Sequence, residues 1–382
     1  MLELVEARWR TDLYRTENEF VQWLQEITGS THKNGRARSP RHEGGVKLGI
    51  GDDAALVSVK RGHELILTTD MSIEGIHFLN GVHPAEAVGH RALARSLSDV
   101  AAMGGVPRYV LVSLAISREA GRKWISRFYR GMQALARRFE VRLVGGDTAV
   151  VPAGTVIDVL VAGEVPKGKA LRRSGARAGD LIYVSGRLGL SALGLRLLRN
   201  KQPGPVKVAQ ASRPVLQAGQ AQPRVAVPLA EARVPVPLAR EAIQAHLYPE
   251  PQCALGRFLS RRGLASALID VSDGLSTDLS RLCTASGVGA RLWATKIPGP
   301  SLPCTADSLQ LALHGGEDYR LVFTVPRREA SHLPSKFEGH LLYHLGEIEG
   351  SKGVKLIAAD GKVRTLAPGG WDHFRSLNAS SG

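Results

Sequence analysis

The chain alternates between two hydrophobic periods, which predict helices and strands in a mixed α/β arrangement. Apolar side chains recur every three or four residues, as on a helix that buries one face, in segments 16–27, 85–103, 121–139, 186–198, 254–262 and 275–285. Shorter runs rich in Val, Ile and Leu predict strands at 65–70, 109–116, 141–144, 155–165, 181–184, 267–271 and 321–325. Strands that alternate with helices are typical of α/β domains.

The length of the chain and the breaks in this pattern predict two domains. The 382 residues suffice for two hydrophobic cores. Residues 199–240 are rich in proline and follow neither period, so we expect a disordered or extended insert there. Residues 31–45 are polar, basic and glycine-containing, and we expect a mobile loop. The expected parts are an N-terminal extension at 1–15, a first domain at 16–165, a second domain at 166–374 and a tail at 375–382.

Acidic residues recur where strand-like runs end, next to Gly, Ser or Thr. Asp52 and Asp53 are neighbours, and neighbouring side chains of a strand point to opposite faces, so one core does not bury both. The other acids in this setting are Asp70, Asp99, Asp147, Asp270, Asp273, Glu317 and Asp318. Each is a common turn residue when taken alone. Together they indicate a site for a hard divalent cation such as Mg²⁺, which takes oxygen ligands.

Composition narrows the classes of partner. The formal net charge of +15 favours anionic partners such as nucleotides and phosphates. Nucleic acid fits less well, because the basic segment 199–240 has no aromatic side chain on which bases would stack. The apolar runs are too short to cross a bilayer, and residues 1–10 lack the apolar core of a secretory signal. Cys253, Cys283 and Cys304 are widely spaced, which supports neither a zinc ribbon nor a disulfide framework, so we expect a reducing cytoplasm.

Several other residues offer contacts to anionic or polar ligands, each beside a structural alternative. Arg172 and Arg173 lie in a glycine-containing turn, where they clamp a polyphosphate or form a solvated turn. Ser272 precedes a predicted helix, whose free N–H groups favour an anion. His77 follows Asp70 closely, and it is either a ligand-binding or a structural histidine.

The motifs, taken in order, resemble the thiamine-monophosphate kinase family. This family is part of a PurM-like superfamily with aminoimidazole ribonucleotide synthetase, selenophosphate synthetase and a hydrogenase maturation factor. The matching stretches are 49–57, 68–78, 93–105, 144–148, 173–179, 269–275, 314–319 and the closing 371–374. The resemblance runs from about residue 16 to residue 374, apart from the insert at 199–240.

The resemblance implies a fold and a reaction. The implied PurM-like fold has two domains: an N-terminal mixed sheet that forms a barrel across a homodimer, and a C-terminal α/β domain. The implied reaction transfers phosphate from ATP to thiamine monophosphate, giving thiamine diphosphate, and uses several Mg²⁺ ions. The implied partners are these two substrates and a second copy of the chain, with neither nucleic acid nor membrane.

The resemblance also implies site residues. The metal-binding set is Asp53, Thr68, Thr69, Asp70, Asp99, Asp147, Asp270 and Asp273. The ATP-binding set is Gly146, Asp147, Arg173 and Ser272, and the substrate-binding set is His77, Glu317 and Trp371. Glu317 is expected to hydrogen-bond the aminopyrimidine of the substrate, and Trp371 to stack on a ring. We expect direct in-line transfer with no covalent nucleophile, and closure of the loop 31–45 over the site.

Two rival interpretations remain at this stage. The first is a sister enzyme of the superfamily, but selenophosphate synthetase needs a reactive Cys in its N-terminal glycine-rich stretch, and this chain has none before Cys253. The hydrogenase maturation factor ends in Cys, which this sequence does not. Aminoimidazole ribonucleotide synthetase lacks the Gly-Gly-Glu-Asp-Tyr and Trp-Asp-His-Phe motifs found here. The second rival is a non-enzymatic nucleotide or nucleic-acid binder, which only the net charge favours.

Overall fold

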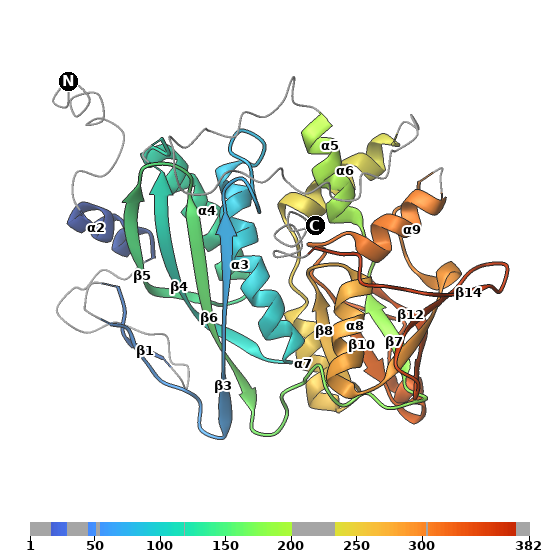
Figure 1. Cartoon of the computed structure of the whole chain (residues 1–382). Helices are drawn as coiled ribbons and strands as arrows, with labels where there is room; N and C mark the ends of the chain where they lie inside the picture. Colours follow the sequence, from blue (N-terminus) through green and yellow to red (C-terminus); the bar gives the residue numbers. More distant parts are fainter. Residues whose placement is uncertain are drawn as a thin grey trace, which may run out of the picture. The chain divides into compact units, whose positions relative to one another are not determined.

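A computed structural model describes residues 17–28, 45–50, 54–117, 119–200, 234–302 and 305–371. These residues form two compact units, and both are α/β, as the two periods predict (Figure 1). Unit 1 contains the described residues of Met1–Val100 and Val106–Gly168. Unit 2 contains those of Ala101–Gly105, Lys169–Pro205 and Arg213–Gly382.

Unit 1 is built on a four-stranded sheet with the order β3-β6-β4-β5. Its strands are β3 (His63–Ile73), β4 (Val106–Ser117), β5 (Arg142–Val151) and β6 (Val156–Pro166). Helix α4 (Arg122–Arg138) connects β4 to β5, which pair in parallel and therefore need a crossover. The unit also contains α2 (Glu17–Thr28), α3 (Ala85–Ala102) as far as Val100, and the short antiparallel pair β1 (Val46–Leu48) and β2 (Leu56–Val57).

Alternation along β3 separates a covered face of this sheet from an open one. Ile66 and Ser72 are buried, whereas Leu65, Leu67 and Met71 are exposed. The same alternation runs through the first half of the neighbouring strand β6, since side chains of a strand point to the two faces in turn. On the open face the pair β1–β2 covers one region, where Val46 packs with Tyr109 and Ala162. The exposed apolar side chains of β3 lie outside that cluster.

Unit 2 is built on an eight-stranded sheet with the order β14-β13-β9-β12-β7-β10-β8, and β11 pairs with β12. Its strands are β7 (Leu181–Ser185), β8 (Ala267–Val271), β9 (Gly289–Trp293), β10 (Arg320–Val325), β11 (Lys336–Phe337), β12 (His340–Glu349), β13 (Gly353–Ile357) and β14 (Val363–Thr365). Its helices are α5 (Leu190–Asn200), α6 (Val236–Leu247), α7 (Cys253–Arg262), α8 (Leu275–Ser286) and α9 (Thr305–His314), with short 3₁₀ turns at Ala294–Lys296 and Arg327–His332.

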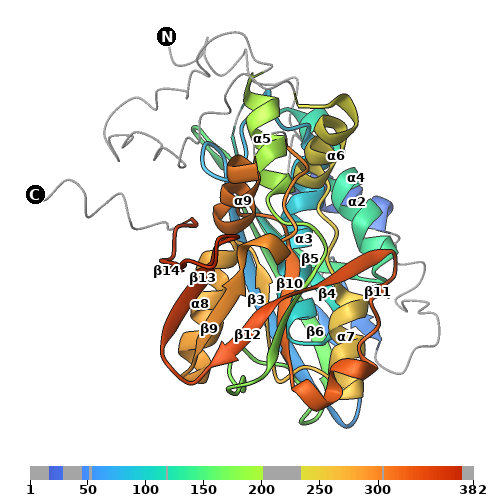
Figure 2. The same cartoon turned by 90° about the vertical axis from the view of Figure 1, so that its right-hand side faces the viewer.

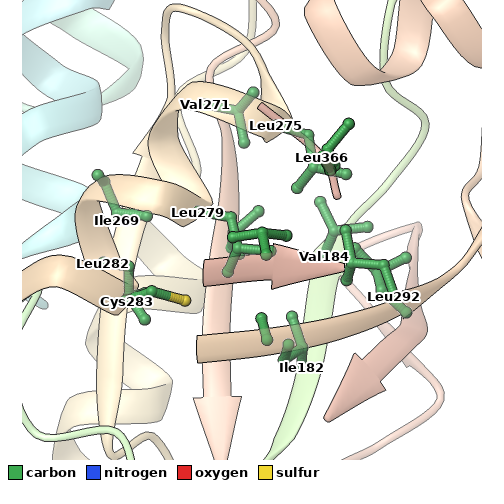
Figure 3. Packing of buried hydrophobic residues seen from close by; sticks show 14 of the residues in the cluster. Ile182, Val184, Ile269, Val271, Leu275, Leu279, Leu282, Cys283, Leu292 and Leu366 are labelled. Carbon is green, nitrogen blue, oxygen red and sulfur yellow. The ribbon is translucent and has the colours of Figure 1, made fainter. Parts of the chain in front are cut away.

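Two hydrophobic clusters hold unit 2 together. In the larger one, Leu275, Leu279 and Leu282 of α8 pack on Ile182 and Ile269 of the sheet (Figure 3). The smaller cluster joins α5, α6 and α9, which lie side by side in Figure 2. Strand β8 is buried along its whole length. The first cluster thus fixes the turn between β8 and α8, and the second fixes the helices beside it.

The insert predicted at 199–240 is shorter than we expect from the sequence. Helix α5 continues to Asn200, and α6 begins at Val236. Pro237 lies in the first turn of α6, where a missing N–H removes no helical hydrogen bond, so its presence does not exclude a helix. Leu238 and Ala242 bury the inner face of α6. The rest of the predicted insert lies outside the described residues, as do the extension at 1–15, most of the loop 31–45 and the tail at 375–382.

The prediction that the acids lie at strand ends is wrong for β3 and β5. Strand β3 pairs with β6 from His63 to Ile73, so Thr68, Thr69 and Asp70 lie in its middle. Strand β5 continues through Asp147, which is paired with Ser113 of β4. Strand pairing uses backbone groups, so polar side chains need not end a strand.

None of the helices in the described ranges combines the length and the continuous apolar surface that a membrane span requires.

Candidate active site

On the covered face of unit 1, hydroxyl and carboxylate groups meet between β3 and α3. The hydroxyl of Thr68 donates a hydrogen bond to Oδ2 of Asp99. The Ser96 hydroxyl lies 3.2 Å from Oδ2 of Asp70 and 2.9 Å from the carbonyl oxygen of Val159. Asp70 and Asp99 are both half-buried. The oxygen atoms of this cluster are the donor type that a hard cation prefers.

The cluster contains a competing cation. Nε of Arg95 lies 3.8 Å from Oδ1 of Asp70. Within the described residues, no three His, Cys, Asp or Glu side chains gather into a complete metal site. Asp53, the leading residue of the predicted metal set, lies outside the described ranges. The donor chemistry on the covered face fits Mg²⁺, but this cluster by itself contains only part of a ligand set.

A second polar row crosses the open face of the same sheet. The Thr69 hydroxyl donates to Oδ1 of Asp158 at 2.7 Å. Asp158 of β6 pairs with Ser113 of β4, and Ser113 pairs with Asp147 of β5. Paired residues share a face, so these side chains form a line across three strands. Sequence reasoning missed Asp158, although an acid inside the apolar run 156–161 was a signal for it.

The predicted metal residues of β3 therefore divide between two faces. Thr68 and Asp70 point to the side of α3, whereas Thr69 points to the open face with Asp147. Consecutive residues of a strand alternate in direction. Two of the three consecutive residues thus share the covered face, and Thr69 belongs to the other.

Gly146 and Asp147 occupy a special backbone position in β5. Gly146 has φ 153°, and a Cβ atom there would lie 2.0 Å from the carbonyl oxygen of Val112. Only glycine fits this conformation and spacing. Asp147 is exposed, and its Oδ1 accepts the backbone N–H of Thr148 at 2.8 Å. The predicted pair is thus placed where a strand side chain reaches solvent.

His77 has a structural contact at the end of β3. Its Nδ1 accepts the backbone N–H of Ile73 at 3.0 Å, and its own backbone N–H donates to the carbonyl oxygen of Ile73 at 2.8 Å. The imidazole therefore closes the turn that ends the strand. This supports the structural interpretation of His77, and its predicted role in substrate binding stays a prediction.

In unit 2, a buried carboxylate shapes the turn between β8 and α8. Oδ2 of Asp278 accepts the backbone N–H groups of Asp273 at 2.9 Å and Gly274 at 3.0 Å. Nη1 of Arg281 donates to Oδ2 of Asp273 at 2.5 Å and to Oδ1 of Asp278 at 2.8 Å. Burial, together with the charge of Asp273, raises the pKa of Asp278 to about 6.

This turn differs from the anion site that the sequence predicts before α8. Asp278 already occupies two of the backbone N–H groups to which a phosphate would bind. Asp278 has a side-chain exposure of only 1% and acts as an internal anion. Sequence reasoning missed it, because an acid early in a helix is ordinary. Ser272 stands just before this turn and is half-buried.

The loop after α9 lies against the same turn. The N–H of Glu317 donates to the carbonyl oxygen of Ser272 at 2.7 Å, and the N–H of Tyr319 donates to that of Val271 at 2.9 Å. Glu317 and Tyr319 have φ 66° and 49°, a left-handed conformation that is uncommon for such residues. Backbone strain of this kind persists where the surrounding contacts hold it, and it is frequent at functional sites.

The C-terminal segment of unit 2 is fixed to the start of α8. The N–H groups of Gly369, Gly370 and Trp371 donate to Oγ of Ser276 at 3.2 Å, Oγ1 of Thr277 at 3.0 Å and the carbonyl oxygen of Asp273 at 3.1 Å, respectively. Oγ of Ser276 also lies 2.9 Å from Nδ1 of His314. The backbones of Ser272, Asp273, Glu317 and Trp371, distant in sequence, thus meet at one turn.

Arg173 is placed apart from that gathering, whereas Asp270 lies in the strand that leads into it. Arg173 is exposed, and its carbonyl oxygen accepts the hydroxyl of Ser286 at 3.0 Å, at the far end of α8 from Ser272. A helix rises by about 1.5 Å per residue, so these ends are roughly 16 Å apart. Asp270 is buried within β8. The structure does not bring Arg173 and Ser272 together within unit 2.

Comparisons with known proteins agree with the resemblance seen in the motifs. The model of the AIR synthase related protein N-terminal domain matches residues 51–165, and that of the C-terminal domain matches residues 177–359. A thiamine-monophosphate kinase of Salmonella typhimurium is 35% identical over 346 residues, which cover 89% of this chain and 95% of that protein. The chain belongs to the thiamine-monophosphate kinase family.

Solved structures of thiamine-monophosphate kinases share the fold described above. The crystal structure of the enzyme from Stenotrophomonas maltophilia has a TM-score of 0.67 at 30% identity, covering 92% of this chain and 98% of that chain. The structure of AaThiL complexed with AMPPCP and TMP has a TM-score of 0.65 at 26% identity, covering 94% and 97%. The predicted PurM-like fold with two α/β parts is confirmed.

Proposed function

We propose that this chain is an ATP-dependent kinase that phosphorylates thiamine monophosphate to thiamine diphosphate. Its curated relatives are thiamine-monophosphate kinases, and a solved relative is complexed with AMPPCP, an ATP analogue, and TMP. The observation that carries the proposal is the meeting of Ser272, Glu317 and Trp371 at the β8–α8 turn of unit 2. The side chains on these backbones include a carboxylate and an indole, which are the types that suit a flat, cationic, nitrogen-rich ring.

The proposed transfer is direct, from ATP to the phosphate of the substrate, with no phosphoenzyme. The second pKa of a phosphate ester is about 6, so the acceptor oxygen is ionised at neutral pH and needs no strong base. Burial raises the pKa of both Cys253 and Cys283 to about 12, so neither is a thiolate at neutral pH. The hydroxyl of Ser276 accepts the N–H of Gly369 and contacts Nδ1 of His314, so this Ser–His pair has a structural role. What the reaction requires is alignment and neutralisation of charge.

Mg²⁺ is the proposed metal, and several ions are expected. Bound at oxygen donors, it would offset the charge of the phosphates during transfer. The oxygen donors on the covered face of unit 1 fit a hard cation. Within that cluster, the carboxylate of Asp99 orients the hydroxyl of Thr68 by accepting its hydrogen bond. The proposed metal-binding residues are Asp53, Thr68, Thr69, Asp70, Asp99, Asp147, Asp270 and Asp273.

The nucleotide and substrate residues follow the same family assignment. We propose that Gly146, Asp147, Arg173 and Ser272 bind ATP. Arg173 is exposed, so its guanidinium is accessible to a phosphate that arrives from solvent. The proposed substrate residues are His77, Glu317 and Trp371.

We further propose that the chain forms a homodimer in the cytoplasm. The exposed apolar side chains Leu65, Leu67 and Met71 alternate along β3, the edge strand of the unit 1 sheet. An exposed apolar edge strand favours pairing with another chain. A second copy that brings the same strand would close the two sheets into the barrel that the family implies. The proposed domain bounds, 16–165 and 166–374, place this strand in the N-terminal domain.

The test is an assay with ATP, MgCl₂ and thiamine monophosphate, with product detection by chromatography. We expect the wild-type chain to form thiamine diphosphate and Asp147→Asn to form none, with an unchanged circular dichroism spectrum. Addition of EDTA is expected to stop the wild-type reaction. A folded wild-type chain that forms no thiamine diphosphate contradicts the proposal, and the next assay would then be aminoimidazole ribonucleotide formation.

A further inference from the structure

A fully buried histidine lies beside the substrate residue Glu317. His246 is in the last turn of α6 and has no exposed surface. Its Nδ1 lies 3.0 Å from the hydroxyl of Ser191 on α5 and 3.8 Å from Oε2 of Glu317. The Glu317 side chain keeps an exposure of 16%, so the carboxylate lies between the buried imidazole and solvent.

The neighbour of Glu317 is anchored to the same helix. The carboxylate of Asp318 accepts the backbone N–H groups of Gly189 at 2.5 Å and Ser191 at 3.1 Å, at the start of α5. Ser191 thus contacts Asp318 through its N–H and His246 through its hydroxyl. Glu317, Asp318, Ser191 and His246 form a closed circuit of contacts.

The helices that carry this circuit are in close contact with each other. A Cβ atom at Gly194 of α5 would lie 2.0 Å from the carbonyl oxygen of Ala242 on α6, so the two backbones meet there. Leu193 and Leu238 pack in the small cluster around this point. Since α5 and α6 are held this closely, the position of His246 relative to Ser191 is well defined.

We propose that His246 is a positioning residue for Glu317. It holds the Glu317 carboxylate in the orientation that accepts hydrogen bonds from a cationic, amino-bearing ring. This inference rests on the proposed function, because it assigns Glu317 to the ring of thiamine monophosphate. It adds a residue of α6, directly after the region where the sequence predicts an insert, to the recognition of substrate.

The geometry explains why a histidine suits this role. The left-handed backbone conformation of Glu317 gives its side chain a direction that it would not have in a regular strand or helix. A carboxylate with little exposure needs hydrogen-bond donors, or its desolvation is uncompensated. The His246 ring, 3.8 Å from the Glu317 carboxylate and fixed by Ser191, limits where that carboxylate can lie without the full charge of Arg or Lys, which would compete with a cationic substrate.

The test compares three variants of the full chain. His246→Leu removes the ring nitrogen and keeps a buried apolar volume, whereas His246→Asn places an amide group close to the position of Nδ1. Leu238→Ala is the matched control, because it loosens the same α5–α6 contact without touching the circuit. Thermal unfolding reports the stability of each variant.

We expect His246→Leu to raise the KM for thiamine monophosphate by about tenfold, because the Glu317 carboxylate loses its fixed position; a tenfold change corresponds to about 1.4 kcal/mol. Its KM for ATP and its kcat are expected to stay within about twofold of wild type. The Kd of thiamine monophosphate, measured by titration calorimetry without ATP, should rise in parallel. His246→Asn should recover most of the affinity, and Leu238→Ala should lower the unfolding temperature while leaving the Kd unchanged.

Two results would overturn the inference while leaving the proposed function in place. One is a wild-type Kd for thiamine monophosphate in His246→Leu. The other is an equal rise of that Kd in Leu238→Ala, which would mean that any loosening of the helices has the same effect. If the wild-type chain neither binds thiamine monophosphate nor forms thiamine diphosphate, the proposed function fails and the inference fails with it.

Discussion

The carboxylate of Asp318 lies 2.5 Å from the backbone nitrogen of Gly189, at the N-terminal end of α5. It also accepts the N–H of Ser191, and both bonds join the loop after α9 to a helix that is distant in sequence. A negative charge is favourable at a helix N-terminus. Burial nevertheless opposes ionisation and raises the pKa of Asp318 to about 6.

The first prediction concerns stability against pH at Asp318. The folded chain holds this proton more tightly than the unfolded chain does, because the pKa rises from 3.8 to about 6 on folding. The protonated Asp318 carboxyl therefore makes its full contribution to the free energy of unfolding below the pKa of the unfolded chain. That contribution is lost as the pH rises through the pKa of the folded chain. We expect the difference in unfolding free energy between wild type and Asp318→Asn to fall over this range by on the order of 3 kcal/mol.

Denaturant unfolding at a series of pH values measures this difference. Asp360→Asn is a control of opposite sign, since the backbone N–H of Lys362 lowers the pKa of this exposed carboxyl. A difference between wild type and Asp318→Asn that stays constant with pH would show that the carboxyl ionises normally in the folded chain.

The second prediction concerns the backbone at Gly146. Gly146→Ala would place a Cβ atom 2.0 Å from the carbonyl oxygen of Val112, so β4 and β5 must separate. We expect a loss of stability of about 3 kcal/mol or more, together with loss of kinase activity as Asp147 moves. Gly154→Ala is the matched control: its φ is also positive, at 70°, but apart from its chain neighbours no atom of the described residues lies within 4 Å of the new Cβ. Calorimetric unfolding of both variants checks this, and equal losses would refute it.

The third prediction concerns Thr277, which holds the C-terminal segment. Its hydroxyl accepts the N–H of Gly370, next to Trp371. Thr277→Val removes that acceptor at nearly constant volume, and we expect the KM for thiamine monophosphate to rise about fivefold, as for one hydrogen bond of about 1 kcal/mol. Thr277→Ser keeps the hydroxyl and should behave as wild type. Steady-state kinetics decide the matter, and a serine variant as impaired as the valine variant would assign the effect to packing.

The fourth prediction concerns the metal requirement and Asp99. Asp99→Asn is expected to lower kcat by at least about a hundredfold, as for other losses of charge stabilisation in an active site. It should also raise the Mg²⁺ concentration needed for half-maximal rate. Glu86→Gln is the control on the same helix, because Glu86 pairs with Arg127 and lies outside the cluster. Activity measured against MgCl₂ concentration tests the pair, and the same shift in both variants would count against a specific role for Asp99.

The fifth prediction concerns the open face of unit 1. Leu67 is 63% exposed on the edge strand β3. If a second copy covers this face, Leu67→Asp buries a charge in the interface and is expected to give a monomer. Leu341→Asp, at a comparably exposed leucine of unit 2, should leave the oligomeric state unchanged. Sedimentation velocity distinguishes the species, and a dimeric Leu67→Asp would exclude this face as the interface.

Much of the fold follows from the pattern of the chain. The helical periods at 85–103, 121–139 and 275–285 correspond to α3, α4 and α8, because each period buries a continuous apolar stripe. The prediction of an insert up to residue 240 was wrong at its C-terminal end, because it was based on proline content and not on a hydrophobic period. Proline at 235 and 237 suggested a linker, although proline is well tolerated in the first turn of a helix such as α6.

Motifs in the sequence identified the candidate site residues, but they did not identify the side chains that contact those residues in the fold. Asp158, Asp278 and His246 were missed, since each has an ordinary local sequence and acquires its role through a partner elsewhere in the fold. Asp158 became visible only through the pairing of β6 with β3 and β4. His246 became visible only when α6 packed on α5.

By itself, the sequence determined the family, the alternation of helices and strands, and the residue types that suit phosphate and Mg²⁺. These depend on local spacing, which the order of residues already contains. Only the tertiary structure decided that Thr68 and Thr69 face opposite sides of a sheet, and that Asp278 fills the turn before its own helix. Such relationships depend on pairing and packing between distant segments, so no local pattern specifies them.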